Sequence, residues 1–398
     1  MEEWKQYKLI DVLDTLIDYR GKTPRKTMSG IPLITAKIIK NGRIDTPNEF
    51  IAIEDYDSWM VRGFPKVGDV VVTTEAPLGE VAQLDDENVA LAQRVVTLRG
   101  KAGVLDNTYL KYFLLSHVGQ QRLKARETGT TVTGIKQSEL REVLIDCPPY
   151  ETQIKIASVL SSLDDKIEIN KRINDNLEKQ VQALFKSWFV DFEPFKDGEF
   201  EESELGFIPK GWSLYEFGRV LSPVNEKVGD KIVTEYSVGN TGIRSRSDIY
   251  HKTICSNPEK NRIIRKGDLV FGMGNDRVTW GIMKDEIGAT SPAYPVFQID
   301  KDIDYIYFEF FFKHFYAQSK DLIRPSVRQG QTIDKGALMQ KKIYMPPKNV
   351  WDRFLHIHNP IIETSRCVEI ESNRLSDLRD MLLPHLMSGI LKESEMNA

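Results

Sequence analysis

The sequence predicts an α+β protein in which two pseudo-symmetric α/β domains are separated by two long helices that form a coiled coil. Three pairs of landmarks recur at an offset of 198 or 199 residues: Gly68-Asp69 with Gly267-Asp268 (267 − 68 = 199), Tyr109 with Tyr307 (307 − 109 = 198), and Pro148-Pro149 with Pro346-Pro347 (346 − 148 = 198). A fixed internal period over half of a 398-residue chain indicates a duplicated unit. A protein built from two related units suggests a target with two parts.

The first α/β domain is expected over residues 1–149. Short apolar runs at residues 31–34, 67–73 and 89–98 are separated by Gly, Pro and Asn, which is typical of strands joined by turns. A helix is predicted to follow over residues 107–126.

A long helix is predicted next, over residues 150–190. Its seam residues recur at alternating spacings of three and four: Leu160, Leu163, Ile167, Asn170, Asn174, Leu177, Val181, Leu184 and Trp188. This pattern over four heptads favours a coiled coil over an ordinary amphipathic helix. The two asparagines in the seam are a device that fixes register. About 38 helical residues at ~1.5 Å each give a rod of roughly 57 Å.

The second copy begins after an acidic linker over residues 191–205, which holds seven acidic residues and one lysine between positions 191 and 204. The second domain is expected over residues 206–347 and the second long helix over 348–391. The second seam consists of Ile361, Val368, Leu375, Leu378 and Leu382.

The start of the second long helix carries Asn359-Pro360. Asn is a good helix cap and Pro suits the first helical position, so a new helix is expected to begin there. The sequence therefore predicts a short helix over residues 350–358, a break near Pro360, and a long helix to about Leu383 that Pro384 ends or kinks.

Composition is that of an ordinary globular chain, with 41% hydrophobic and 28% charged residues. No apolar run approaches the ~18–20 residues that span a bilayer, and the N-terminus lacks the pattern of a signal peptide. Cys147, Cys255 and Cys367 are far apart, which argues against a disulfide framework and a structural zinc site. A cytoplasmic location is the expectation.

Net charge is −4, and this average argues mildly against a stand-alone nucleic-acid binder. The charges are segregated, however. Residues 20–44 hold seven basic residues and no acidic one, and a second group consists of Lys320, Arg324, Arg328, Lys335, Lys341 and Lys342. A basic run is more often a solvated surface than a binding face, but its recurrence in both halves favours binding.

Three motifs that resemble catalytic sites are incomplete. Gly21-Lys22-Thr23 lacks the earlier glycine of a phosphate-binding loop, because position 16 is Leu16. Cys147-Pro148-Pro149-Tyr150 has cysteine, a weak acceptor, where amino-methyltransferases have Asn or Asp. The Gly-Met-Gly at 272–274 is no complete dinucleotide motif. The six histidines show no metal-ligand spacing. The chain is expected to hold neither catalytic nor metal-ligating residues.

A set of motifs, weak one by one but specific in this order, resembles a known family. They are Gly21-Lys-Thr-Pro24, Gly68-Asp69, Pro148-Pro-Tyr-Glu-Thr-Gln-Ile-Lys-Ile-Ala157 with residues 160–165, Leu184-Phe-Lys-Ser-Trp-Phe189, Leu205-Gly-Phe-Ile-Pro-Lys-Gly-Trp212 and Leu382-Leu-Pro-His-Leu-Met-Ser-Gly389. In these motifs the whole chain resembles the specificity subunit of type I restriction–modification systems.

The resemblance implies two target-recognition domains and an antiparallel helix pair that acts as a ruler between them. It implies that each domain reads one half of a bipartite double-stranded DNA site. It also implies two methyltransferase subunits docked on the helices, which bind S-adenosylmethionine and methylate adenine, and an ATP- and Mg-dependent restriction subunit that translocates DNA. This chain itself would bind no cofactor. The second half departs from the motif at residues 347–351 and at Pro360.

Candidate DNA contacts follow from side-chain chemistry, since Lys and Arg neutralise phosphates while Arg, Asn and Gln can read base edges. The phosphate candidates are Lys22, Arg25, Lys26, Lys37, Lys40, Arg324, Arg328 and Lys335. The base-reading candidates are Gln93, Arg94, Thr130, Thr131, Lys136, Asn275, Arg277, Gln329, Gln331 and Thr332. The segments Gly129–Thr131 and Gly330–Thr332 are matched at an offset of 201 (330 − 129).

Two other function classes stay open at this stage. A scaffold or antirestriction-like adaptor would use the helices for protein contacts and select no DNA motif. An enzyme, such as a methyltransferase or fused nuclease, would bind S-adenosylmethionine by itself. Because the two domains differ outside the landmarks, the two half-sites are expected to be different.

Overall fold

The computed structural model describes residues 4–19, 21, 23–129, 133–247, 257–272, 278–325 and 331–389. The chain divides into two compact units. Unit 1 comprises Met1–Asp175 with Ser365–Ala398, and unit 2 comprises Asn176–Thr364. No helix among the described residues is long and apolar enough to cross a membrane.

Unit 1 is built on an antiparallel four-stranded sheet. Its strands β2 (Leu13–Asp18), β11 (Val95–Gly100), β8 (Val70–Thr74) and β9 (Leu78–Gln83) lie in the order β2-β11-β8-β9. A continuous apolar cluster that includes Val70, Val72 and Val81 lies between this sheet and the helices. The β8 run is buried at all five positions, which explains its unbroken apolar sequence.

Smaller elements complete unit 1. A second four-stranded sheet has the order β10-β4-β7-β3 and consists of β10 (Ala90–Leu91), β4 (Ile31–Ile34), β7 (Phe50–Ile51) and β3 (Lys26–Thr27). The other pairs are β1 (Lys5–Lys8) with β12 (Leu144–Cys147) and β5 (Ile39–Lys40) with β6 (Arg43–Ile44). The short helices are α1 (Leu9–Val12), η1 (Ile53–Asp55), α2 (Tyr56–Trp59) and α5 (Gln137–Arg141).

The single helix expected over residues 107–126 is two helices, α3 (Asn107–Leu115) and α4 (His117–Lys124). Ser116 separates them in an extended conformation, and its hydroxyl accepts a hydrogen bond from the Gly119 amide as an N-cap. A serine that caps the second helix competes with continuation of the first. Apolar periodicity does not show this interruption.

Unit 2 repeats the strand order of unit 1. Its central sheet, in the order β16-β23-β20-β21, consists of β16 (Leu221–Pro223), β23 (Val296–Ile299), β20 (Leu269–Phe271) and β21 (Trp280–Ile282). Helix α8 (Tyr305–Phe315) takes the place of α3, and β15 (Ser213–Glu216) pairs with β26 (Lys342–Met345) as β1 pairs with β12. The core is aromatic where that of unit 1 is aliphatic, with Phe217, Phe271 and Phe308 fully buried.

The remaining unit 2 elements are hairpins and short helices. The hairpins are β13 (Phe200–Ser203) with β14 (Gly206–Pro209), β17 (Tyr236–Gly239) with β18 (Gly242–Ser245), β19 (Arg262–Arg265) with β22 (Ile287–Thr290), and β24 (Ile323–Pro325) with β25 (Gln331–Ile333). The helices are α7 (Phe217–Val220), η2 (Glu193–Phe195), η3 (Pro258–Lys260), η4 (Lys320–Leu322) and α9 (Lys335–Met339). The acidic segment expected as a linker is ordered: Phe192 and Phe195 pack on Trp212.

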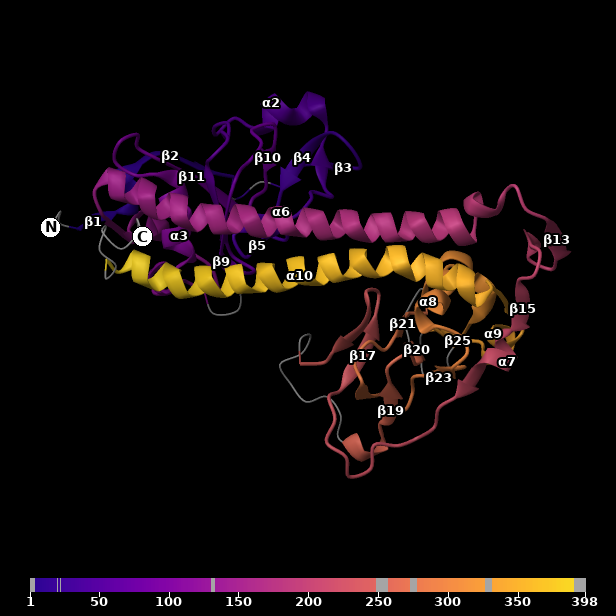
Figure 1. Ribbon diagram of the computed structural model, residues 1–398. Helices are drawn as coiled ribbons and strands as arrows, with labels where there is room; N and C mark the ends of the chain where they lie inside the picture. Colours follow the sequence, from indigo (N-terminus) through magenta and orange to yellow (C-terminus); the bar gives the residue numbers. More distant parts are fainter. Residues whose placement is uncertain are drawn as a thin grey trace. The chain divides into compact units, whose positions relative to one another are not determined.

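The long helices are α6 (Tyr150–Phe189) and α10 (Lys348–Met387), each of 40 residues. Within unit 1 they run antiparallel, because Asn170 bonds Glu371 at 2.8 Å while Asp164 bonds Arg379 at 2.9 Å. Within unit 2 the same direction holds, since Phe185 lies edge-on to Phe354 while Phe189, further along α6, contacts Trp351, which is earlier in α10. The two helices continue through both of these regions (Figure 1). The register of the antiparallel pair is such that the number of a residue in α6 and the number of its contact in α10 add up to about 541 (170 + 371).

Two expectations about α10 are wrong. The helix is unbroken through Pro360 and through Pro384. Pro360 has no N–H to donate to the His356 carbonyl one turn earlier. Both residues are exposed, while Trp351 and Phe354 on the buried face hold the helix in place. Leu378 is 38% exposed and does not belong to the seam; Arg379 occupies the seam position instead.

Candidate nucleic-acid interface

A cluster of polar loops forms where β8 ends and β11 begins, and we call it the unit 1 loop cluster: residues 23–25, 74–76, 93–94, 128–129 and 133–134. The two strands are antiparallel neighbours, so the loops at these two ends meet. The Thr23 hydroxyl donates to Gln93 Oε1 at 3.2 Å, and Arg94 Nε lies 2.8 Å from Glu75 Oε1. Two of the base-reading candidates, Gln93 and Arg94, therefore lie in one place.

The loop around residues 130–132 starts and ends in the same cluster. The backbone groups of Thr128 and Gly134 exchange two hydrogen bonds, of 2.7 and 3.0 Å, which close the loop at its base. Gly134 also pairs with Glu75, and the Ile135 amide donates to the Thr74 carbonyl at 2.9 Å. The candidates Thr130 and Thr131, like Lys22, lie outside the described residues.

The basic candidates of unit 1 are exposed, but they do not form one group. Arg25, Lys26, Lys37, Lys40 and Lys136 are all exposed. Lys26 pairs with Glu49 at 2.7 Å, and Lys40 lies 3.7 Å from Asp45. Lys37 and Lys40 belong to the β5–β6 hairpin, which an ion pair of 3.2 Å between Arg43 and Glu168 ties to α6. The structure thus places these lysines beside the long helix, apart from the contacts of the unit 1 loop cluster.

In unit 2 the described candidates lie on and after the β24–β25 hairpin. Arg324 is exposed opposite Thr332, while Thr332 and Gln331 are half-buried. Asp334 caps α9 by accepting a hydrogen bond from the Ala337 amide at 3.0 Å, which leaves Lys335 exposed on the first turn. The remaining unit 2 candidates lie outside the described residues: Asn275, Arg277, Arg328 and Gln329.

The matching of the two polar loops at an offset of 201 is wrong by three residues. The flanking elements recur at 198: buried Ile135 matches buried Ile333, and α5 matches α9 (335 − 137 = 198). At this offset residues 129–131 correspond to 327–329. Glycine and threonine are common in loops of many kinds, so the similar composition of the two loops does not show that they occupy equivalent positions.

The two Gly-Asp turns are alike in backbone and different in charge. Gly68 and Gly267 have φ of 88° and 87°, and the Asp that follows accepts a hydrogen bond from the amide three residues before it. Arg99 bonds both carboxylate oxygens of Asp69, at 2.7 and 2.6 Å. At the corresponding strand position unit 2 has Gln298, so Asp268 lacks this partner and burial raises its pKa to about 6.

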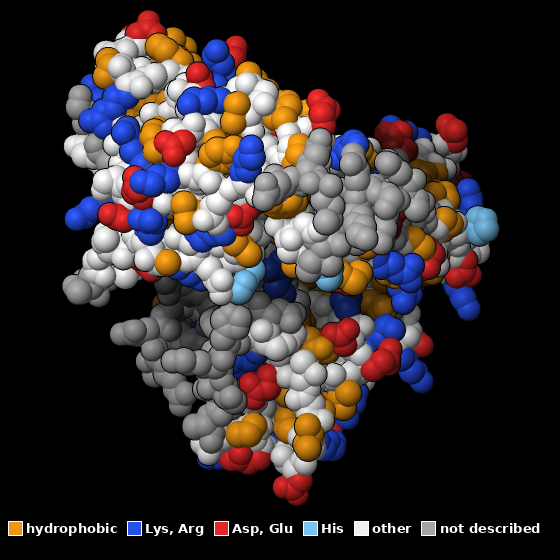
Figure 2. Space-filling model, turned by 90° about the vertical axis from the view of Figure 1, so that its left-hand side faces the viewer, with side chains coloured by type: hydrophobic (Ala, Val, Ile, Leu, Met, Phe, Trp, Pro, Cys, Tyr) orange, Lys and Arg blue, Asp and Glu red, His pale blue; other side chains and the backbone are white. Residues whose placement is uncertain are grey.

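Acidic and basic side chains are interspersed on the face of the molecule that Figure 2 shows. This mixture fits the net charge of −4 and predicts modest affinity for the DNA backbone in the isolated chain.

The Cys147-Pro148-Pro149-Tyr150 motif has a structural role in unit 1. Cys147 is buried, which raises the pKa of its thiol to about 12, far from a reactive thiolate. The diproline forms the turn that starts α6: the buried Gln153 amide group donates to the Pro148 carbonyl at 2.9 Å. Among the described residues no three His, Cys, Asp or Glu side chains are grouped as metal ligands.

A charged cluster that sequence reasoning missed joins α3, α6 and α10 within unit 1. Asp164 accepts hydrogen bonds from the Tyr112 hydroxyl at 2.7 Å and from Arg379 at 2.9 Å, and Lys111 Nζ lies 3.4 Å away. The one sequence feature that indicated this cluster is Arg379, a charged residue at a seam position of the second long helix.

Residues 1–179 match the family model described as the type I restriction modification DNA specificity domain. Across 99% of its length the chain is 27% identical to the type I restriction enzyme MjaIX specificity subunit of Methanocaldococcus jannaschii, covering 95% of that protein. Residues 1–179 thus carry the type I restriction modification DNA specificity domain, and the whole chain is similar to specificity subunits of type I restriction enzymes. Subunits of this family are non-catalytic and provide DNA specificity within a complex with other subunits.

A second curated relative and one solved structure are also similar to this chain, and the structure bears on the fold. The chain is 28% identical to the type I restriction enzyme HindI specificity subunit of Haemophilus influenzae over 49% of this chain and 43% of that protein. The crystal structure of the type I restriction-modification system S subunit from M. genitalium matches with a TM-score of 0.53 at 15% identity, covering 97% of this chain and 96% of that one. The expected α+β architecture of two domains and two long helices is confirmed.

Proposed function

We propose that this specificity subunit recognises a bipartite, asymmetric DNA site, with one half-site read by each repeated domain. The supporting observation is a repeated frame with different loops. The sheet orders β2-β11-β8-β9 and β16-β23-β20-β21 are equivalent. The connected loops differ, since Gln93-Arg94 before β11 corresponds in the strand register to Pro292-Ala293 before β23. Two equal frames that carry unequal loops suit two half-sites of different sequence.

The proposed division of labour follows the chemistry of the side chains. Exposed Arg25, Lys136, Arg324 and Lys335 make no ion pair with other described residues, so they are available to neutralise phosphates. Arg94 and Gln93 in the unit 1 loop cluster carry forked donors and acceptors suited to base edges. Arg94 would exchange its partner Glu75 for a base or phosphate.

We propose further that α6 and α10 dock two methyltransferase subunits. Both helices expose large apolar side chains that no described residue covers, including Ile169 at 52% and Ile362 at 46%. Exposed isoleucines on long helices are suited to helix–helix packing with partners. S-adenosylmethionine would then be bound by the methyltransferase subunits, and ATP with Mg by restriction subunits, while this chain binds no cofactor.

The helix pair is also the proposed ruler between half-sites. Each helix has 40 residues, which at ~1.5 Å per residue corresponds to roughly 60 Å, compared with ~34 Å for one turn of B-DNA. Half-sites a little over one turn apart would match this length.

The test is selection from randomised duplexes with the chain alone and with the chain assembled with its methyltransferase subunits, alongside methylome sequencing of cells with and without the gene. We expect weak binding alone and enrichment of one bipartite motif after assembly. A scaffold would enrich no motif, and sequence-blind binding by the assembled complex would exclude the proposal.

Point variants assign the half-sites. Arg94→Ala should relax base preference in one half-site and Lys335→Ala should weaken binding evenly across sequences. Loss of one base contact costs about 1–3 kcal/mol of discrimination. Lys301→Ala, which removes an equal charge from an exposed turn, is the control.

A further inference from the structure

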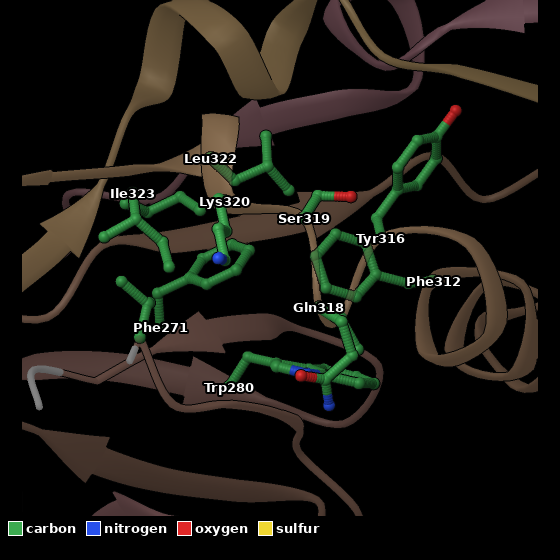
Figure 3. Close-up of a pocket in the computed structure, with 12 residues that line it drawn as sticks. Phe271, Trp280, Phe312, Tyr316, Gln318, Ser319, Lys320, Leu322 and Ile323 are labelled. Carbon is green, nitrogen blue, oxygen red and sulfur yellow. The ribbon is translucent and has the colours of Figure 1, made fainter. Parts of the chain in front are cut away.

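Unit 2 contains a pocket with aromatic walls at the edge of its central sheet (Figure 3). Phe271 and Trp280 come from β20 and β21, and Phe312 from α8. Gln318, Lys320 and Ile323 also line it. Its volume is about 140 Å³. An apolar cavity of roughly 150 Å³ accepts one six-membered aromatic ring.

Three polar groups at this pocket have no side-chain partner among the described residues. They are the Trp280 indole N–H, the Gln318 amide and the Lys320 ammonium group. In Figure 3 the Gln318 side chain extends toward the Trp280 indole, over the open side of the pocket. An amide that both donates and accepts, next to aromatic surfaces, is the chemistry that recognises a planar heteroaromatic ring.

The duplication supplies an internal comparison, because unit 1 has other side chains at the positions of two of the pocket walls. The strand register matches Phe271 and Trp280 with Val72 and Val81, which are fully buried. At the 198-residue offset Gln318 corresponds to Gln120 (318 − 120 = 198).

Gln120 is held in place, unlike its counterpart. Its amide donates to the carbonyls of Gly79 and Leu114, both at 2.8 Å, from within helix α4. In unit 2 the turn after Phe315 and the short η4 replace that helix, which leaves Gln318 exposed. Phe271 and Trp280 also pack on Phe312, but the Gln318 amide, which has no side-chain partner among the described residues, contributes nothing to that packing.

We propose that this pocket receives the six-membered ring of one unstacked nucleobase from the DNA half-site that unit 2 reads. The inference rests on the proposed function. Stacking between aromatic side chains with hydrogen bonds to the base edge is the usual way to hold an extrahelical base. Exposed Lys320 and Arg324 flank the pocket without described ion pairs, which suits the phosphates on either side of such a base.

A positional scan of the unit 2 half-site tests this with the full chain assembled with its methyltransferase subunits. At each position the paired base is compared with a mispaired base and with an abasic nucleotide, leaving out the methylated adenine, which methyltransferases themselves extrude. Mispairing lowers the free-energy cost of unstacking a base, so at one position we expect the complex to bind the mispaired duplex more tightly than the paired one. An abasic nucleotide at that position has no base to enter the pocket, so the duplex that contains it should not bind more tightly.

Variants connect that position to the pocket. Trp280→Ala should weaken binding of the intact site by roughly 5- to 150-fold and abolish the effect of mispairing. Gln318→Ala changes an exposed side chain, so it should keep the fold while reducing the preference among bases at that position. Gln120→Ala removes the matched amide from unit 1 and should leave the unit 2 scan unchanged.

The outcomes separate the two proposals. A flat scan in a complex that still selects its bipartite motif overturns the pocket inference alone, whereas loss of all motif selection overturns the proposed function. A second experiment measures the binding of deoxynucleoside monophosphates to the native chain and to Trp280→Ala. If free nucleotides bind through Trp280 while the scan on DNA is flat, the pocket takes free nucleotides and the DNA assignment is overturned.

Discussion

Asp164 of α6 and Arg379 of α10 form an ion pair of 2.9 Å within unit 1, and the same carboxylate accepts a hydrogen bond from Tyr112 of α3. One carboxylate thus joins the recognition domain to both long helices. At the 198-residue offset Tyr112 and Asp164 correspond to Phe310 and Ile362, so unit 2 lacks this group. Phe310 instead stacks on Phe185. The first domain is held by charge and the second by aromatic packing.

Asp164→Asn should destabilise unit 1 by about 2–3 kcal/mol, because Lys111 and Arg379 would lose the carboxylate that they share and only Arg379 would keep another, that of exposed Asp380. Urea unfolding of the full chain measures this. Asp165→Asn, which changes an exposed neighbour, should cost less than about 0.5 kcal/mol. Equal effects of the two variants would show that the cluster contributes nothing.

The same cluster predicts acid sensitivity. Burial opposes ionisation of Asp164, but hydrogen bonds from Tyr112 and Arg379 and the charge of Lys111 outweigh it and hold its pKa below the ordinary value. Because the pKa is lower in the folded state, the stabilisation is present above the unfolded carboxyl pKa of ~3.9 and is lost as the pH falls below it. The free energy of unfolding of Asp164→Asn should therefore change less between pH 3 and 5 than that of the native chain.

The paired Gly-Asp turns should respond to the same substitution with opposite signs. Asp69→Asn removes the partner of Arg99 and should destabilise by about 2–3 kcal/mol. Asp268→Asn should stabilise by about 1–2 kcal/mol at pH 7.5, because it removes a buried carboxylate whose pKa is raised by burial to about 6.

The pH dependence provides a second measurement on Asp268. The folded pKa of Asp268, about 6, lies above its unfolded value. The contribution of Asp268 to stability is therefore most favourable at low pH and is lost as the pH rises from about 4 to about 6. Urea midpoints at pH 5 and 7.5 should differ less in Asp268→Asn than in the native chain. If the native chain were more stable than Asp268→Asn at pH 7.5, the raised pKa of Asp268 would be contradicted.

Pro360→Ala tests the continuity of α10. In an unbroken helix the alanine restores a backbone hydrogen bond and should stabilise by about 1–3 kcal/mol. Asn359→Ala should then be nearly neutral. If a second helix started at Asn359, that variant would lose a cap at a cost of about 1 kcal/mol and Pro360→Ala would gain nothing. Thermal unfolding of both variants distinguishes these cases.

The ruler is tested by lengthening both helices together. Two heptads inserted between Asp175 and Asn176 and two between Ser365 and Arg366 keep the pairing, because these positions face each other in the register (175 + 366 = 541). Fourteen residues add ~21 Å, or about six base pairs of spacer. Methylome sequencing reads the spacer, and a motif with its original spacer would contradict the ruler.

A matched control for this experiment leaves the helices unchanged. The same fourteen residues inserted at Asp197-Gly198, in the exposed turn between η2 and β13, should keep the spacer at its original length. Insertion into α6 alone should misalign the seam and prevent assembly, since Asn170 would lose Glu371.

Local patterns in the sequence determined the duplication, the apolar strands and the heptad seam of α6. The duplication shows in motifs that recur at 198 or 199 residues, whereas the strands and the seam depend on residues a few positions apart. Burial follows from that short periodicity: Leu160, Ile167 and Val181 are buried as the seam requires. The family was also readable from ordered motifs. The break at Pro360 was wrong because local propensity was overridden by the packing of Trp351 and Phe354 on the aromatic core of unit 2.

Only the tertiary structure decided which polar residues meet. Asp164 and Arg379 are 215 residues apart, and Thr23 and Gln93 are 70 apart. Such contacts depend on how strands pair and helices cross, which no local spacing encodes. The same holds for Gln120 and Gln318: identical residues at equivalent positions are bonded in one unit and open in the other, because a helix in the first is a turn in the second.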